Sequence, residues 1–387
     1  CMEVGIMKRF KIKTEVCFSD NAIDALSEIK NKRAVIITDS FMSSSGAAKR
    51  IADKLTGCIS VDIFDQVRPD PPIEMVVAGV RFLTEHQADV VVALGGGSSI
   101  DAAKGVVLMM KKTRPEQKIS LIAIPTTSGT GSEVTEFAVI TDKERGIKYP
   151  LVDEELLPDM AILDPSLVMT APPSVTADTG FDVITHALEA YVSTNASDAS
   201  DALAEKALEL AFEYLPKAYK NGNDLVAREK MHSASCLAGM AFNAVSLGVN
   251  HGIAHQLGAK FHIPHGRANA MLLPYVIEFN ADLEGHFGEA DSQAAVRYAK
   301  VAKRIGLPCN NVRMGVLSLV KELSYMLDMM KVPRTLSAAG VNESDYKAVK
   351  ADILRAAVAD PCTATNPRHV GEADVELIVN KLIDWNL

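Results

Sequence analysis

The two halves of the chain carry different hydrophobic patterns, and this contrast limits the possible folds more than any other feature. Between residues 33 and 164, short runs rich in β-branched residues alternate with stretches of helical spacing, such as residues 46–55 and 73–87. Strands are predicted at residues 34–38, 59–64, 89–94 and 119–124. Most of these runs are continuously apolar, which indicates strands covered on both faces by helices. The first half is therefore expected to be a doubly wound α/β fold with a parallel sheet.

After the break at Pro172 and Pro173 the β-rich runs stop and helical spacing takes over. Helices are predicted at residues 200–219, 229–247, 292–305, 311–330, 344–359 and 372–385. We therefore predict an α/β domain over residues 1–173 and an all-α helical bundle over residues 174–387.

Composition excludes several classes of partner. Forty basic residues stand against 49 acidic ones, which gives a formal net charge of −9, so nucleic acid is not expected as a partner. The longest apolar runs, residues 90–94 and 121–124, are far shorter than the roughly 18 residues that span a bilayer, so no membrane partner is expected. Charged residues in the segment 7–13 argue against a signal peptide, and the six cysteines form no CxxC pair. These features predict reduced thiols and a cytoplasmic protein.

The predicted strand at residues 89–94 runs into a glycine turn, residues 95–99 (GGGSS), and then into a helical stretch. Such a unit presents free backbone N–H groups and the positive end of a helix dipole, where a phosphate can bind. A tight turn with Ser98 as the helix N-cap is the alternative interpretation, and three glycines alone do not decide between the two.

A second polar turn, residues 125–133 (PTTSGTGSE), follows the next predicted strand and favours the phosphate hypothesis. Open α/β sheets bind ligands in the crevice at the carboxyl ends of neighbouring strands. The chain lacks the GxxxxGK[ST] of a P-loop and the strict GxGxxG fingerprint, and Asp39, which could hold an adenosine ribose, precedes the glycine turn. We therefore predict a variant Rossmann arrangement, with Asp39 as a plain helix N-cap as the competing interpretation.

Histidine and aspartate residues in the second half have the spacing of a metal site. Asp182 and His186 form one i, i+4 pair and His251 and His255 form another, and His265 follows in a loop bounded by proline and glycine. Nine histidines in 387 residues would give about 0.2 such His pairs by chance. Each histidine alone is more often structural than a ligand, but the combined set is typical of a divalent metal site that suits Zn²⁺ and Fe²⁺ equally.

A metal that faces a nucleotide crevice predicts an alcohol dehydrogenase. The metal lowers the pKa of a bound alcohol and stabilises the alkoxide, from which hydride leaves to a nicotinamide.

Four ordered motifs resemble those of the iron-containing alcohol dehydrogenase family, and the resemblance extends over nearly the whole chain. They are residues 94–104 (LGGGSSIDAAK), 125–133, 180–189 (GFDVITHALE) and 250–266, which contains NHGIAHQLG and PHG. The segments 146–150, 200–206 and 261–265 look most similar to the propanol dehydrogenase branch found with bacterial microcompartments. The resemblance implies an enzyme that interconverts a short-chain primary alcohol and its aldehyde with NAD(H), in the cytoplasm or inside a microcompartment. A homodimer or larger homo-oligomer is expected.

The same resemblance implies the functional residues. By this resemblance, the metal is Fe²⁺, with Zn²⁺ as the other suitable ion, and its ligands are Asp182, His186, His251 and His265. His255 would relay the proton of the alcohol. It places the pyrophosphate on Gly96, Gly97 and Ser98, lines the cofactor with Thr126, Thr127, Thr130, Val139 and Lys148, and puts Asp70 near the adenosine. Asp39 would favour NAD by meeting the 2′-hydroxyl and repelling a 2′-phosphate.

Two hypotheses from other classes stay open beside this one. The first is a Zn²⁺-dependent polyol oxidoreductase of the glycerol dehydrogenase or dehydroquinate synthase type, and the motif around His251 argues against it. The second is a non-catalytic nucleotide- and metal-binding subunit, which His255 beside four ligands argues against.

Overall fold

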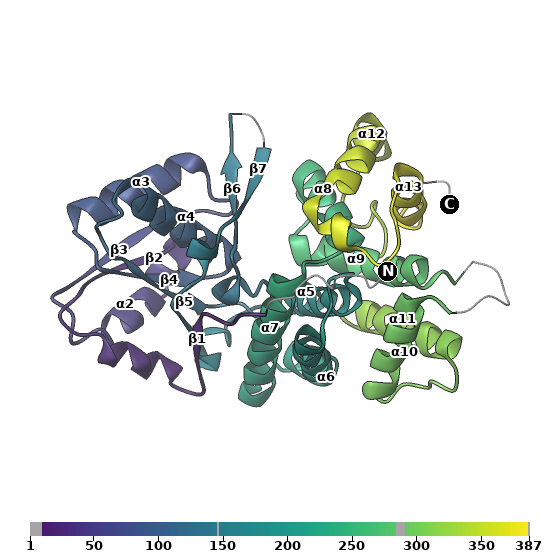
Figure 1. Ribbon diagram of the computed structural model, residues 1–387, viewed down its shortest axis with the longest axis horizontal. Coiled ribbons are helices and arrows are strands. Elements are labelled where there is room, and N and C mark those ends of the chain that lie inside the picture. Colours follow the sequence, from purple (N-terminus) through teal and green to yellow (C-terminus); the bar gives the residue numbers. More distant parts are fainter. Residues whose placement is uncertain (1–9, 145–146, 284–290, 386–387) are drawn as a thin grey trace, which may run out of the picture.

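The structure is a computed structural model that describes residues 10–144, 147–283 and 291–385. Its first half contains a parallel sheet in the order β1-β8-β5-β4-β2-β3 (Figure 1). The strands are β1 (Glu15–Phe18), β2 (Arg33–Asp39), β3 (Ser60–Val67), β4 (Val90–Gly95), β5 (Ser120–Pro125) and β8 (Met160–Leu163).

Helices cover both faces of this sheet, which explains the continuous apolar runs. In β2, Val35 and Ile37 pack with α3 (Ile73–Glu85) and α4 (Gly97–Thr113), while Ala34 and Ile36 pack on the opposite face. That opposite face is covered by η1 (Ala22–Glu28) and α2 (Ala47–Ala52), and the short α1 (Ser40–Ser44) follows β2. The predicted parallel sheet between helix layers is confirmed.

The winding direction of the sheet reverses between β2 and β4. Strand β2 pairs with β3 on one side and with β4 on the other, and β4 then leads on to β5. In open α/β sheets the crevice at such a reversal, outside the carboxyl ends of the strands, is where ligands bind. The residues that end these two strands are Asp39 and Gly95.

An antiparallel hairpin lies outside the main sheet and is absent from the sequence prediction. It consists of β6 (Phe137–Asp142) and β7 (Ile147–Val152). Figure 1 shows it standing opposite the helices α8 and α12. It joins the α3 side of the domain through a bridge between Pro72 and Thr141.

The second half is helical, as predicted. Its helices are α5 (Pro173–Val192), α6 (Asp198–Lys220), α7 (Leu225–Val245), α8 (Val249–Phe261), α9 (His265–Ala281), α10 (Gln293–Arg304), α11 (Val312–Met329), α12 (Glu343–Ala359) and α13 (Glu372–Asn380). Helix α13 ends five residues before the predicted end at residue 385. None of the described helices is long and apolar enough to cross a membrane.

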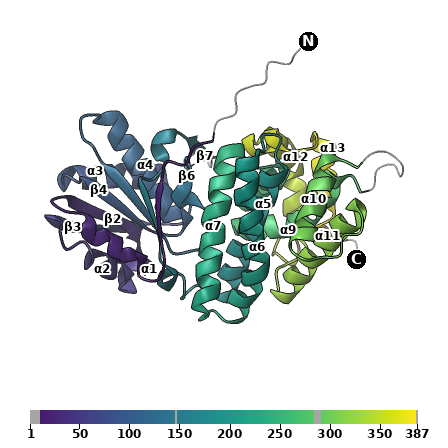
Figure 2. The same ribbon diagram turned by 60° about the horizontal axis from the view of Figure 1, so that its bottom comes forward.

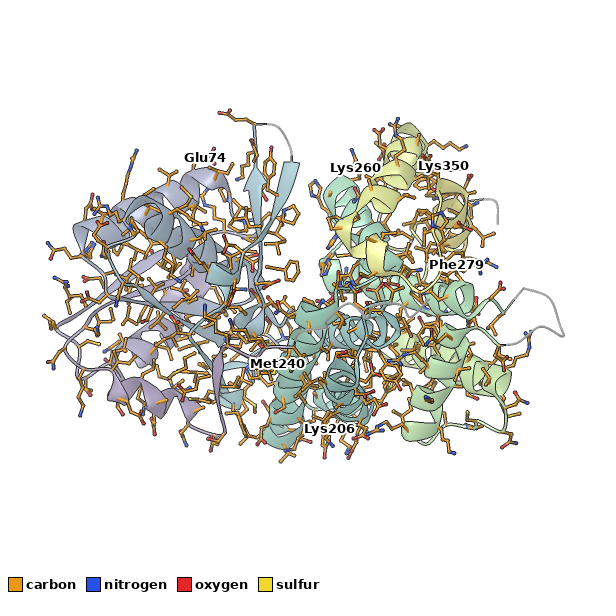
Figure 3. All side chains as sticks on the ribbon, in the orientation of Figure 1. Glu74, Lys206, Met240, Lys260, Phe279 and Lys350 are labelled. Atoms are coloured by element: carbon orange, nitrogen blue, oxygen red, sulfur yellow. The ribbon has the colours of Figure 1, made fainter. Side chains whose placement is uncertain are left out.

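Helix α7 joins the two halves and lies between the sheet domain and the remaining helices (Figure 2). Met240 of α7 packs beside Val134 and Leu163 of the sheet domain (Figure 3). Gly131 and Gly239 also meet there, because a Cβ added to Gly131 would lie 2.7 Å from the Cα of Gly239. Small residues at this junction therefore let the turn after β5 approach α7 closely.

Candidate active site

Four predicted metal ligands converge where three helices meet. Asp182 and His186 come from α5, His251 comes from α8, and His265 is the first residue of α9. The Oδ1 atom of Asp182 lies 3.9, 3.8 and 3.5 Å from the Nε2 atoms of His186, His251 and His265, respectively. The potential ligand atoms of the four residues all lie within 4.8 Å of one another.

Local structure places each of these side chains. The i, i+4 spacing puts Asp182 and His186 on one face of α5. His265, which the sequence places in a loop, instead begins α9 after Pro264, because proline ends the preceding segment and helical geometry follows at once. Gly266 allows this start to press against α5, since a Cβ there would lie 2.1 Å from the Asp178 carbonyl oxygen.

The charge state of the cluster suits a cation. Burial lowers the pKa of His186 and lowers that of His251 well below its usual value, so both rings are neutral and can act as ligands. The amide nitrogen of Asn269 lies 2.8 Å from Asp182 Oδ1, 3.0 Å from His251 Nε2 and 3.2 Å from His265 Nε2. An amide has only two hydrogens to donate, whereas three acceptor atoms surround this nitrogen. One carboxylate and three imidazoles are also a donor set that fits Fe²⁺ or Zn²⁺.

Glu189 orients one of these ligands from behind, a residue that the sequence analysis missed. The residue is 2% exposed, and its carboxylate contacts Nδ1 of His251 and accepts a hydrogen bond from the backbone N–H of Asn250 at 2.8 Å. Burial raises the pKa of Glu189 to about 8, although backbone N–H groups oppose the shift. The ionised form of Glu189 can only accept hydrogen bonds, so with that form His251 donates from Nδ1 and its Nε2 lone pair faces the cluster. The signal was present in the sequence, because Glu189 follows His186 by three residues on the same helix face.

The glycine turn has free backbone donors where a phosphate would need them. Gly96 is the N-cap of α4 and no side chain caps the helix, so the alternative with Ser98 as N-cap is wrong. The backbone N–H groups of Gly97 and Ser98 belong to the first turn, whose donors lack intrahelical partners. This 17-residue helix points its positive end at the crevice.

The threonine turn after β5 faces the glycine turn and contacts helix α5. A Cβ on Gly96 would lie 3.5 Å from Thr127, and one on Gly97 would lie 2.8 Å from Thr130. The backbone N–H of Thr126 donates to the Gly95 carbonyl at 3.0 Å. On its other side the turn meets α5, since a Cβ on Gly129 would lie 2.7 Å from Thr179. The predicted phosphate crevice and the ligand cluster are therefore neighbours.

Asp39 caps a helix and also lies beside the glycine turn. One carboxylate oxygen caps α1 by accepting the Met42 N–H at 2.9 Å. The other oxygen lies 3.4 Å from Ser99 Oγ, at the glycine turn. The N-cap interpretation is thus confirmed, and a role of this carboxylate toward an adenosine ribose stays a prediction.

The remaining predicted cofactor residues lie on or beside the β6–β7 hairpin. Val139 of β6 is 37% exposed, and its N–H donates to Asp101 of α4 at 3.0 Å. Asp70 has a left-handed backbone, with a φ of 52°, in the loop that meets β6 through Pro72. Lys148 pairs with Thr141 in the hairpin register, and the prediction for its side chain lies outside the described residues.

His255 lies beside the ligands with a carboxylate behind it. Its ring is centred 5.9 Å from that of His251 and 5.4 Å from that of His265. Its Nδ1 atom lies 2.8 Å from Asp360 Oδ2, and its side chain is 38% exposed. The sequence analysis missed Asp360, because 105 residues separate it from His255 and no local pattern links them.

An aromatic wall completes the site. The ring of Phe242 stacks on His186 with centroids 4.5 Å apart, and Phe137 lies 6.3 Å from Phe242. A metal-type cluster with an apolar wall, next to a nucleotide-type crevice, is characteristic of a metal-dependent oxidoreductase.

Comparison with known proteins gives the family. Residues 13–165 match the family described as iron-containing alcohol dehydrogenase, and residues 176–383 match the C-terminal part of the Fe-containing alcohol dehydrogenase family. The chain belongs to the iron-containing alcohol dehydrogenase family, and it is an oxidoreductase.

Three relatives illustrate the range of similarity. The 1-propanol dehydrogenase PduQ of Citrobacter freundii is 43% identical over 97% of this chain and 100% of its own length. The NADPH-dependent butanol dehydrogenase of Clostridium saccharobutylicum is 39% identical over 96% of this chain and 97% of its own. The solved structure of sulfoacetaldehyde reductase from Bifidobacterium kashiwanohense in complex with NAD⁺ is 27% identical, with a TM-score of 0.84 over 98% of this chain and 99% of its own.

Proposed function

We propose that the enzyme interconverts a short-chain primary alcohol, such as 1-propanol, and its aldehyde with NAD(H). The observation that carries this proposal is the convergence of Asp182, His186, His251 and His265 beside the crevice at the carboxyl ends of β2, β4 and β5. The similarity to 1-propanol and butanol dehydrogenases supports the substrate class. The aromatic wall beside His186 is suited to a small alkyl group.

We propose that these four residues hold Fe²⁺, with Zn²⁺ as the other ion that suits the same donors. A divalent ion bound there supplies Lewis acidity that lowers the pKa of the alcohol. The protein orients the ligands: Glu189 directs the Nε2 atom of His251 toward the cluster, and Asn269 donates to Asp182.

NAD(H) is proposed to lie across the crevice between the two domains. Gly96, Gly97 and Ser98 would bind the pyrophosphate through backbone N–H groups at the positive end of α4. Thr126, Thr127, Thr130, Val139 and Lys148 would line the cofactor, with Asp70 near the adenosine. The carboxylate of Asp39 would accept a hydrogen bond from the ribose 2′-hydroxyl and repel a 2′-phosphate.

His255 is proposed to take the proton of the alcohol. It neighbours His251 and His265 in space and is partly exposed to solvent, so it can pass a proton outward. Packaging in a bacterial microcompartment, a cytoplasmic location and a homo-oligomeric state remain predictions from the sequence resemblance.

Steady-state kinetics with metal analysis test this function. Enzyme loaded with Fe²⁺ or Zn²⁺ without oxygen should reduce NAD⁺ with C2 to C4 primary alcohols and oxidise NADH with the aldehydes, as followed at 340 nm. Failure of every alcohol and aldehyde in both metal forms would refute the proposed reaction.

A ligand variant with a matched control tests the metal site. His265→Ala should lose metal and turnover with unchanged helical circular dichroism, because the His265 side chain is 41% exposed at the edge of the cluster and contributes little to the core. His262→Asn, at an exposed left-handed position three residues earlier, should keep both. A His265→Ala enzyme with stoichiometric metal and full rate would disprove the ligand assignment.

A further inference from the structure

The segment that follows α12 packs against α8 and places the carboxylate of Asp360 beside His255. Asp360 precedes the short helix η5 (Pro361–Thr365) and is separated from His255 by 105 residues. Gly252 of α8 permits this close approach, because a Cβ there would lie 2.2 Å from Thr363 Oγ1 and 3.5 Å from the Asp360 Cβ.

Hydrogen bonds fix the segment at several points. Thr363 Oγ1 donates to the Ala357 carbonyl at 2.7 Å, and Thr365 Oγ1 donates to the Leu247 carbonyl at 2.7 Å. The Asn366 side chain accepts the N–H of Val249 at 3.2 Å, at the start of α8. The packing of η5 against α8 therefore fixes the backbone position of Asp360.

The two oxygens of Asp360 have different partners. Oδ1 accepts the backbone N–H of Cys362 at 2.9 Å, and Oδ2 lies 2.8 Å from His255 Nδ1. The Asp360 side chain is only 11% exposed, whereas that of His255 is 38% exposed. An ionised carboxylate can only accept hydrogen bonds, so this contact keeps a proton on Nδ1 and leaves the lone pair on Nε2.

We propose that Asp360 is the positioning residue for His255: it holds the imidazole in the Nδ1–H tautomer with Nε2 toward the substrate oxygen. This inference rests on the proposed function. In alcohol oxidation the O–H bond breaks and its proton forms an N–H bond at Nε2, while the hydride and its electron pair pass from the carbinol carbon to NAD⁺. Asp360 stabilises the resulting imidazolium and gains no proton, as the aspartate of a Ser–His–Asp triad does.

Asp360→Asn is the informative change, since it removes charge and keeps shape. The amide oxygen can still accept the Cys362 N–H, so the start of η5 should be preserved. The amide NH₂ would then face His255 Nδ1 and donate to it, which moves the ring proton to Nε2 and abolishes the base. We expect kcat to fall by about 10² to 10⁴ with little change in KM for the alcohol.

A double-mutant cycle separates positioning from general structural support. Asp360→Asn, His255→Ala and the double variant are compared for kcat, metal content and NADH affinity, with Asp352→Asn on the exposed face of α12 as the matched control. If Asp360 acts through His255, the double variant should be no slower than His255→Ala, and metal content and NADH affinity should stay within about twofold of wild type.

Several results would overturn the inference. One is a kcat of the double variant that falls by the product of the two single losses, and another is a kcat of Asp360→Asn within about threefold of wild type. A third is a second metal ion per chain that is lost in Asp360→Asn, because His255, Asp360 and Cys362 also lie close enough to bind a metal ion. An inactive wild type would remove the proposed function and this inference together. An active wild type and control beside an equally active Asp360→Asn would remove the inference alone.

Discussion

Glu189 offers a sharp test of how the buried surroundings of the cluster control metal binding. Its Oε2 contacts Nδ1 of His251 and its Oε1 accepts the Asn250 N–H at 2.8 Å. In Glu189→Gln the amide oxygen can keep the bond to Asn250, but the NH₂ group then faces His251. It would donate to Nδ1 and force the ring proton onto Nε2, the atom that faces the other ligands.

The expected loss follows from one interaction. At about pH 9, above the pKa of about 8 that burial gives Glu189, the wild-type carboxylate is ionised. Under that condition the variant exchanges a charge-assisted hydrogen bond, worth about 1.5 to 3 kcal/mol, for a tautomer that cannot bind metal. Because only the metal-bound form needs the Nε2 lone pair, this difference should appear in binding as roughly a 10- to 100-fold weaker metal affinity. Folding should be affected less, since the shape of the side chain and the bond to Asn250 remain.

Competition between the protein and a chromophoric chelator for Zn²⁺ measures the affinity directly, and thermal unfolding of the metal-free proteins checks folding. Glu213→Gln is the control, because Glu213 is an exposed residue of α6 whose side chain is 57% accessible. Equal metal affinity of Glu189→Gln and wild type would refute the argument that Glu189 sets the tautomer of His251.

Three further predictions concern the α/β domain. Asp39→Gly should raise the NADP/NAD ratio of kcat/KM by about tenfold or more, equivalent to about 1.4 kcal/mol. The free energy of unfolding should fall by only a few tenths of a kcal/mol, because glycine is tolerated at an N-cap. An unchanged ratio would mean that Asp39 acts only as a helix cap. Lys104→Met should lower the free energy of unfolding by about 3 to 5 kcal/mol in urea titrations, because it removes the ammonium that serves buried carboxylates and two backbone carbonyls. Burial lowers the pKa of Lys104 to about 8, and a loss of stability below about 1 kcal/mol would contradict the prediction. The hydrogen bond from Arg33 lowers the pKa of Asp89 in the folded protein. The stability difference between wild type and Asp89→Asn should therefore be complete above the unfolded pKa of about 3.9 and should be lost as pH falls through the lower folded pKa. A constant difference in the free energy of unfolding from about pH 7 to about pH 3 would disprove this linkage.

Local pattern predicted much of this fold. The runs at β2, β4 and β5 are apolar on both faces, and this property alone requires helices on both sides of a parallel sheet. Helices with one apolar stripe, such as α6 and α10, were also located within a few residues. By contrast, periodicity gave no bounds for α5, because residues 180–192 are buried on every side and present no polar face. The hairpin β6–β7 was missed because it lies outside the sheet and lacks a continuous apolar run.

The sequence by itself determined the chemical types of the candidate site, and tertiary structure decided which residues act together. Spacing along one helix was enough to pair Asp182 with His186 and His251 with His255, because helical geometry is fixed by local hydrogen bonds. The contacts of Glu189 with His251 and of Asp360 with His255 join residues 62 and 105 positions apart. Such contacts depend on how buried helices pack, with Gly252 and Gly266 allowing close approach, and packing is a property of the whole core that no local pattern records.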